Sequence, residues 1–336
     1  MADRTLVEWT DATWNIITGC EIESPGCKNC YAMRLAGTRL RNHPSRTGLT
    51  RESAAGPVWT GETRFNKQWL KQPLKWKRRR KIFVVAHGDL FYEGVPDDCI
   101  DLVFVIMILA RQHTFQVLTK RVARMAAYIA SRSTPEGYAK LEAAARSIGH
   151  SLHDHGAPAA LWPLPNVWLG ASVESQPYAD ARREPLRQVA AAGWITWVSY
   201  EPALGPVNWT GWEFLRWFVA GGESGRGARP SHPVWHRNAR DFCEATGVSF
   251  VFKQWGQWRP MHFHEIAKHA GMSVRLVSDG SRRAIGDGCH HRAHQVEAML
   301  ADPTYGWQVP ILSVGKKRAG RQLDGVEHNE YPEMAS

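Results

Sequence analysis

Three cysteines lie within eleven positions near the start of the chain, at Cys20, Cys27 and Cys30. Cys27 and Cys30 have the C-x-x-C spacing that lets two thiolates face one ion. Pro25 and Gly26 bend the chain, so that Cys20 can return toward the other two. Three thiolates on one loop can hold a metal centre and leave a coordination position open. The residues therefore predict a metal centre on this loop.

Three interpretations of the cysteines compete. A [4Fe–4S] cluster with three protein ligands leaves its fourth iron open to a small molecule. A structural zinc needs a fourth ligand, which Cys99 or the run Cys289-His290-His291 would supply. A disulfide fits less well, because the clustered cysteines are odd in number and nothing marks the chain as secreted. Spacing alone leaves the cluster and the zinc both open.

Length and composition set the class of protein. A chain of 336 residues with 43% hydrophobic content can bury a large core, as one domain or as one domain with an appendage. The N-terminus lacks the apolar segment of a signal peptide, and no run reaches 18 apolar residues. We therefore expect a cytoplasmic protein with reduced thiols and no membrane segment.

The net charge of +10 is concentrated near the start of the chain. Residues 1–81 hold 16 Lys and Arg against 7 Asp and Glu. The densest part is a run that would suit nucleic-acid phosphates, and its members are Lys75, Lys77, Arg78, Arg79, Arg80 and Lys81. The alternative is a solvated helix end that precedes a buried strand.

The rest of the chain alternates short apolar runs with amphipathic stretches. The apolar runs are rich in β-branched and aromatic residues, as buried parallel strands are. They lie at residues 14–18, 82–86, 115–118, 167–172, 195–199, 217–220 and 248–252. Candidate helices lie at residues 31–41, 97–112, 122–131, 179–192 and 233–246. This rhythm predicts an α/β fold, a partial (β/α) TIM-like barrel of six to seven parallel strands.

Two further segments complete the predicted organisation. Residues 1–260 form the partial barrel, and about 132–165 is an insertion with its own helix at 137–149. Residues 261–336 form a C-terminal α+β appendage, with strands at 273–277 and 308–312 and a helix at 293–301. Cys99 and Cys243 fall in helix patterns and suit buried small residues. The run Cys289-His290-His291 suits a surface turn better than a second metal site.

Polar residues follow six successive predicted strands. In a parallel barrel, chemistry gathers at the carboxyl ends of the strands, so these residues are the candidates for binding and catalysis. They are Asp89, Thr119, Lys120, Ser172, Glu174, Glu201, Glu223 and Gln254. The alternative is that the carboxylates cap the helices that follow. For six strand ends around the cysteine loop together, that alternative is weak.

The chain resembles the phage Gp37/Gp68 family of three-cysteine-motif proteins from about residue 6 to 333. The segments that carry the resemblance are Gly19-Cys20, Cys27-Lys-Asn-Cys30-Tyr-Ala, Phe115-Gln-Val-Leu-Thr-Lys-Arg121, Asn166-Val-Trp-Leu-Gly-Ala-Ser-Val-Glu174, Tyr200-Glu-Pro-Ala-Leu-Gly-Pro206, Gly221-Gly-Glu-Ser-Gly225, Phe252-Lys-Gln-Trp-Gly256 and Lys316-Lys-Arg-Ala-Gly-Arg-Gln-Leu-Asp-Gly325.

The order of motifs is also similar, more distantly, to the spore-photoproduct-lyase branch of the radical S-adenosylmethionine (SAM) enzymes. In that branch a strand ends in Gly-Cys and the last cluster cysteine precedes Tyr-Ala, as Cys30 does here. A Thr-Lys pair ends the third strand, as Thr119 and Lys120 do. The chain differs in its longer first cysteine gap and in Asn29, where the branch has an aromatic residue.

The likeness to radical SAM enzymes implies a chemistry. Cys20, Cys27 and Cys30 would hold a [4Fe–4S] cluster, and SAM bound to its open iron would be cleaved to a 5′-deoxyadenosyl radical that abstracts hydrogen from a substrate. Asp89, Thr119, Ser172 and Glu174 would bind SAM, with Asp89 at the methionine amino group and the last two at the ribose. Substrate or SAM would contact Lys120, Glu201, Glu223 and Gln254.

The partners follow from the same reading. The enzyme would need an electron donor to reduce the cluster, and a nucleic acid or nucleotide is the favoured substrate class. A protein partner cannot be read from the sequence. The competing hypothesis is a zinc-stabilised, phage-type nucleic-acid-binding protein without enzymatic activity, with the basic N-terminal quarter as its binding face.

Overall fold

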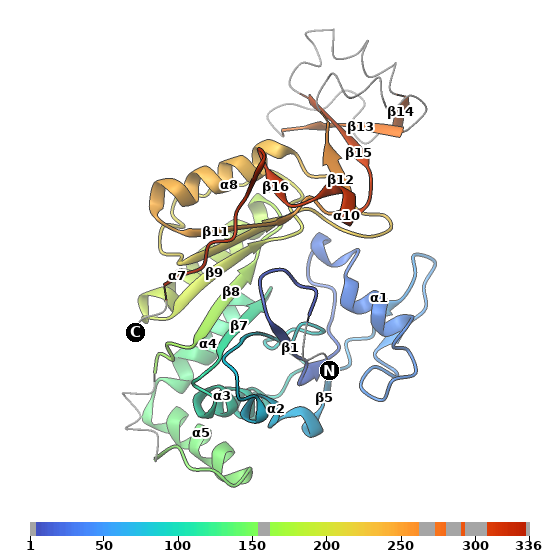
Figure 1. Ribbon diagram of the computed structural model, residues 1–336. Coiled ribbons are helices and arrows are strands. Elements are labelled where there is room, and N and C mark those ends of the chain that lie inside the picture. The colour runs from blue at the N-terminus through green and yellow to red at the C-terminus, as the bar shows by residue number, and fades with distance from the viewer. Residues whose placement is uncertain (1–4, 154–161, 262–272, 280–289, 293–307, 334–336) are drawn as a thin grey trace.

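The fold is built on one parallel sheet. The computed structural model describes residues 5–153, 162–261, 273–279, 290–292 and 308–333. Seven parallel strands pair in chain order (Figure 1). They are β1 (Ala12–Trp14), β6 (Lys81–Val84), β7 (Thr114–Thr119), β8 (Val167–Ser172), β9 (Ile195–Tyr200), β10 (Trp217–Gly221) and β11 (Ser249–Gln254). The predicted α/β class and open half-barrel are confirmed.

Helices connect the strands and cover one face of the sheet. They are α3 (Asp97–Leu109), α4 (Val122–Arg132), α5 (Pro135–Ser147), α7 (Gln176–Ala191) and α8 (Pro233–Thr246). Two aspartates begin α3, where carboxylates favour the positive end of the helix dipole. The short helix α1 (Tyr31–Gly37) lies apart from them, across the sheet in the view of Figure 1.

The two faces of the sheet bury different side chains. Outward-facing residues such as Val117 and Leu169 pack with the apolar face of α3 in the main core. The concave face holds a second cluster of mainly aromatic residues, which includes Trp9, Phe83, Trp168, Trp197 and Trp217. Trp9 comes from the N-terminal segment, and its ring centre lies 5.4 Å from that of Trp197. The segment therefore covers part of the concave face that an open half-barrel leaves exposed.

The first predicted strand, at residues 14–18, is divided in two. β1 ends at Trp14, and β2 (Ile17–Thr18) pairs with β5 (Arg64–Phe65) outside the main sheet. The break falls at Asn15, whose side-chain oxygen accepts a hydrogen bond from the backbone of His87 at 3.0 Å. Further short elements that the sequence did not predict are β3 (Thr50–Arg51), β4 (Val58–Trp59), the 3-10 helix η2 (Lys67–Trp69) and α2 (Gln72–Lys75).

The predicted insertion at 132–165 contains α5, close to the predicted helix at 137–149. Leu141 and Ala145 of α5 are buried in the main core, and α5 packs against α3 and α4. The segment thus contributes to the same core as the barrel helices. Its bounds as an insertion stay a prediction.

A second sheet follows the barrel. Its strands are antiparallel, in the order β12 (Trp258–Pro260), β15 (Gln308–Ser313), β13 (Ser273–Ser278) and β14 (His290–Arg292). The predicted strands at 273–277 and 308–312 are confirmed, whereas the predicted helix at 293–301 lies outside the described residues. The division of the chain at residue 260 stays a prediction.

The last described segment returns to the barrel. It contains α10 (Lys316–Ala319) and a small hairpin of β16 (Gln322–Leu323) and β17 (Val326–Glu327). Leu323 joins the main core. Tyr331 stacks on Trp217 with ring centres 5.5 Å apart. This segment therefore packs against both faces of the sheet, through Leu323 on one face and Tyr331 on the other.

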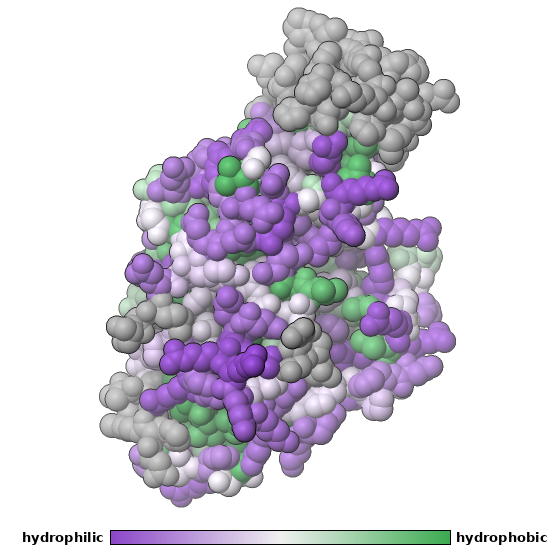
Figure 2. Space-filling view, viewed as in Figure 1, coloured by the Kyte–Doolittle hydropathy of each residue, from purple (hydrophilic) through white to green (hydrophobic). Residues whose placement is uncertain are grey.

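The surface seen in Figure 2 is mostly hydrophilic, with small and separate hydrophobic areas. Exposed large apolar side chains are few among the described residues, and include Leu6 and Ile22. Scattered residues of this kind are ordinary on a globular protein. Within the described ranges, no helix has both the length and the apolar character that crossing a bilayer requires.

One buried histidine makes the stability of this fold depend on pH. His236 in α8 is fully buried and shares a hydrogen bond of 2.9 Å with Ser231 Oγ. Burial lowers its pKa from 6.5 to about 3. As pH falls, the unfolded chain therefore binds this proton before the folded chain does. The stability that neutral His236 contributes is complete above pH 6.5 and is lost as pH falls toward about 3.

We expect the free energy of unfolding to fall by up to about 1.4 kcal/mol for each pH unit in this window because of His236. Urea denaturation at stepped pH values measures the slope. His236→Gln removes the titrating group and keeps a partner for Ser231, so its slope should be shallower. Equal slopes for the two proteins would show that His236 does not set the dependence.

Candidate metal centre and adjoining cavity

The three clustered cysteines face one cavity at the carboxyl edge of the sheet. Their loop follows β2, contains the 3-10 helix η1 (Pro25–Cys27) and ends where α1 begins. Cys20, Cys27 and Cys30 are free thiols that line a cavity of about 170 Å³. The residues that share its wall include Phe83, Asp89, Leu118, Thr119, Lys120, Arg121 and Ser172. The structure thus brings the cysteines together with the predicted strand-end residues.

Burial and charge act on the thiols in opposite directions. Burial raises the pKa of the Cys20 and Cys30 thiols, so both carry their protons at neutral pH. Arg121 Nη1 lies 3.8 Å from Cys20 Sγ. Burial also lowers the pKa of Lys120 to about 8. These two cations would offset the charge of thiolates, which metal binding forms with release of protons.

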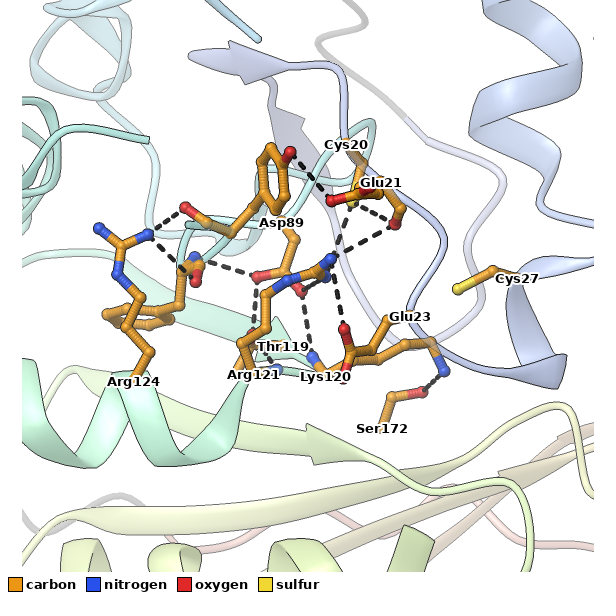
Figure 3. A network of polar contacts seen from close by, with 12 residues as sticks. Cys20, Glu21, Glu23, Cys27, Asp89, Thr119, Lys120, Arg121, Arg124 and Ser172 are labelled. Atoms are coloured by element: carbon orange, nitrogen blue, oxygen red, sulfur yellow. Dashed lines mark hydrogen bonds and ion pairs between the residues drawn. The ribbon is translucent and has the colours of Figure 1, made fainter. Parts of the chain in front are cut away.

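Asp89 is the centre of the polar network in Figure 3. Its carboxylate is buried and accepts hydrogen bonds from Thr119 Oγ1 at 2.6 Å and from the Lys120 backbone at 3.1 Å. Arg121 Nη1 lies 3.2 Å from it. Asp89 therefore fixes Arg121, which in turn reaches the backbone oxygen of Glu21 at 3.4 Å. Through Arg121, the Asp89 carboxylate thus holds the beginning of the cysteine loop in place.

Glu174 holds the middle of the same loop. Its carboxylate is fully buried and is bonded by the Lys120 ammonium, the Ser24 hydroxyl and, at 2.7 Å, Arg182 Nη1. A β-carbon at Gly26 would lie 2.5 Å from the Glu174 carboxylate, so only glycine lets the loop pass this closely. Glu174 itself does not line the cavity. It contacts the loop through Ser24 and lies outside the cavity wall.

Glu223 holds the far end of the cysteine loop. It accepts hydrogen bonds from Asn29 Nδ2 at 2.9 Å and from Arg229 at 2.5 Å. Arg229 also donates to the backbone oxygen of Pro25 at 3.0 Å. Burial alone would raise the pKa of Glu223, but the bonds from Arg229 outweigh it and lower the pKa. Asn29, the residue before the last cysteine, therefore has a structural role, because it binds this end of the loop to Glu223.

A second cavity of about 400 Å³ continues from the cysteines toward β11. It shares Cys27, Cys30, Phe83, Leu118 and Lys120 with the first. All four residues predicted to line the mouth lie in its wall, namely Lys120, Glu201, Glu223 and Gln254. Lys253 joins them and binds both oxygens of Glu201, at 2.7 and 2.9 Å.

The thiols suit an iron–sulfur cluster by donor type and by their common cavity, whose wall also carries apolar side chains and two cations. No three His, Cys, Asp or Glu side chains of the described ranges are placed to hold a single metal ion. Cys99, a candidate zinc ligand, lies on α3 and does not line the cavity. Cys289 lies outside the described residues, and so do the side chains of His290 and His291.

The basic run lies at the opposite edge of the sheet. It leads into β6 and ends at Lys81, the first residue of that strand, whereas Asp89 follows the strand. The exposed members are Lys75, Lys77, Arg78 and Arg79. Arg80 lies over the ring of Trp76 at 5.0 Å, and Lys81 over that of Tyr331 at 4.0 Å. Its role in nucleic-acid binding stays a prediction.

Several residues of the site were not among those predicted from sequence. They are the partners of the carboxylates at the strand ends, namely Ser24, Asn29, Arg121, Arg182, Arg229 and Lys253. The spacing of Glu223 and Arg229, six residues apart, is a weak signal for one of these pairs. The partner of Glu174 on α7 has no such signal, because a mid-helix arginine is ordinarily exposed.

Residues 4–332 match a family profile described as "Protein of unknown function (DUF5131)". The chain belongs to this family. That description does not name the Gp37/Gp68 proteins, so the resemblance to them stays a prediction. No curated protein matches the chain.

Among solved structures, the chain is similar to a spore photoproduct lyase complexed with dinucleoside spore photoproduct. The two share 12% sequence identity with a TM-score of 0.33. The match covers 62% of this chain and 55% of the lyase chain, so it spans about half of that structure. A similarity at this level carries no argument about chemistry, which depends on the residues of the site itself.

The anchoring of the cysteine loop by Glu174 can be tested directly. Glu174→Ala would leave Lys120 and Arg182 buried without their carboxylate, a change that costs about 3–5 kcal/mol of stability. We also expect faster alkylation of Cys27, because Ser24 loses its bond beside that thiol. Urea denaturation and timed alkylation with mass spectrometry measure the two effects.

Glu184→Ala is the matched control, because Glu184 is also a carboxylate paired with an arginine but lies exposed on α7. It should change stability by less than about 1 kcal/mol. If Glu174→Ala behaved like this control, the buried carboxylate would not be the anchor of the loop.

Proposed function

We propose that this protein is an iron–sulfur enzyme of the radical SAM type, with Cys20, Cys27 and Cys30 as the cluster ligands. The observation that carries the proposal is the shared cavity, which all three thiols line at the carboxyl edge of a parallel half-barrel. Three thiolates hold three irons of a [4Fe–4S] cluster and leave the fourth open. The order of sequence motifs supports the same assignment.

A cluster held by Cys20, Cys27 and Cys30 would supply, with bound SAM and one electron from a donor, the reductive cleavage of SAM to methionine and a 5′-deoxyadenosyl radical. The protein supplies the surroundings. Arg121 and Lys120 offset the charge of the thiolates. Phe83 and Leu118 line both cavities and exclude water from the region between them.

The predicted cofactor residues divide into two roles in this proposal. Asp89, Thr119 and Ser172 form part of the polar wall of the cysteine cavity, and we assign them to cofactor binding. Glu174 acts through Lys120 and the loop as a positioning residue. The larger cavity takes the substrate, against Lys120, Glu201, Glu223 and Gln254. We place the protein in the cytoplasm, where thiols stay reduced and an electron donor is at hand.

The proposal is tested by metal content and SAM cleavage together. Anaerobically purified, reconstituted protein should contain iron and sulfide and should convert SAM to 5′-deoxyadenosine under a strong reductant. Cys20→Ala, Cys27→Ala and Cys30→Ala should each lose most of the iron, because a ligand is gone. Cys99→Ala is the control and should keep it, since Cys99 lies on α3 away from the cavity.

The competing hypothesis predicts the opposite pattern. Colourless protein that contains zinc, with no 5′-deoxyadenosine formed, would favour a zinc-stabilised nucleic-acid-binding protein. An intact iron–sulfur cluster without any SAM cleavage would contradict the enzyme assignment and leave an electron-transfer or structural cluster.

A further inference from the structure

Gln254 carries a buried hydrogen-bond acceptor that no described residue satisfies. It ends β11 and lines the larger cavity, and the residue is only 3% exposed. Its Oε1 atom is buried without a hydrogen-bond partner. Buried polar groups are nearly always bonded, so an unpaired acceptor on a residue that lines a cavity suits a ligand that donates a hydrogen bond.

The orientation of this side chain is fixed by a neighbour. Gln254 Nε2 donates to Glu201 Oε1 at 3.4 Å. Because a carboxylate only accepts, the nitrogen of the amide has to face Glu201 and the oxygen has to face away. The acceptor character of the remaining atom is therefore set by the protein.

A donor lies next to this acceptor. Lys253 Nζ binds Glu201 Oε1 at 2.7 Å, the same oxygen that Gln254 reaches, and Oε2 at 2.9 Å. An ammonium has three N–H donors, and the carboxylate takes two. The third is available to a ligand. One acceptor and one cationic donor thus meet on a single carboxylate in the cavity wall.

The rest of the wall suits a flat, weakly polar ring. Trp9, Phe83 and Leu118 line the cavity, and its volume of about 400 Å³ is in the range of small-molecule sites. Two other charged side chains of the wall already have partners: Glu223 is paired with Arg229, and Lys120 with Glu174. Glu8 on the N-terminal segment has one unpaired oxygen but pairs with Lys316 through the other.

We propose that the larger cavity binds a heterocycle with a CO–NH edge, the lactam or imide edge of bases such as uracil and thymine. The ring N–H donates to Gln254 Oε1, and the adjacent carbonyl accepts from Lys253 Nζ. Glu201 positions both groups. That this heterocycle is a substrate rests on the proposed function. Its binding, however, requires neither SAM nor a reduced cluster.

The test compares probes that differ in the N–H donor. Uridine and thymidine present the edge, and 3-methyluridine carries a methyl group in place of that hydrogen. Ligand-observed NMR with the reconstituted full chain measures weak binding. We expect uridine and thymidine to bind at least about tenfold more tightly than 3-methyluridine, which would leave the buried acceptor unpaired. A short oligothymidylate shows whether the base is taken free or within a polymer, and either source supports the site.

Gln254→Met removes the acceptor at similar volume, so uridine and 3-methyluridine should then bind equally and weakly. Gln257→Met is the matched control, since Gln257 donates to Ser313 at 2.9 Å and does not line the cavity. It should keep the full discrimination. Absence of binding by uridine, thymidine and oligothymidylate alike, or equal binding of uridine and 3-methyluridine to the native protein, would overturn the inference. If SAM is not cleaved but the discrimination is present, the proposed function fails and the binding site stands.

Discussion

The cysteine loop depends on one buried carboxylate, that of Glu174. It is fully buried at the end of β8, and its partners are Lys120, Arg182 and Ser24. A lone carboxylate in this place would cost several kcal/mol in lost hydration, so two cations accompany it. Those cations come from the end of β7 and from α7, whereas Ser24 comes from the loop. If the loop moved, the Glu174 carboxylate would lose the hydrogen bond from Ser24 and would remain buried with an incomplete set of partners.

This constraint explains what the strand ends do. Asp89 and Glu223 each hold another part of the loop, through Arg121 and Arg229. Most of the polar groups at the carboxyl edge thus hold the cysteine loop in place in the absence of a ligand, as the proposed metal centre would require. In the proposed function, the groups left to meet a substrate lie farther along the sheet, at the ends of β9 and β11.

The sequence predicted the sheet, and it predicted that the cysteines and the strand-end residues lie together, because both follow from patterns along the chain. Buried parallel strands are continuous apolar runs, and polar residues directly after them have to meet at one edge. The first strand was wrong in part because Asn15 turns the chain within an otherwise apolar run. The partners of the carboxylates were missed because pairs such as Glu174 with Lys120 depend on contacts between distant segments. Whether a polar residue holds the protein together or faces a ligand is decided by those contacts.

The central claim is that three thiols on this anchored loop hold a cluster with one open iron. Mössbauer spectroscopy of ⁵⁷Fe-reconstituted protein, recorded with and without SAM, tests it most directly. The account predicts a [4Fe–4S] spectrum in which one iron site of the four changes its parameters when SAM is added. A spectrum in which SAM changes no site, or protein that takes up zinc in place of iron, would contradict it.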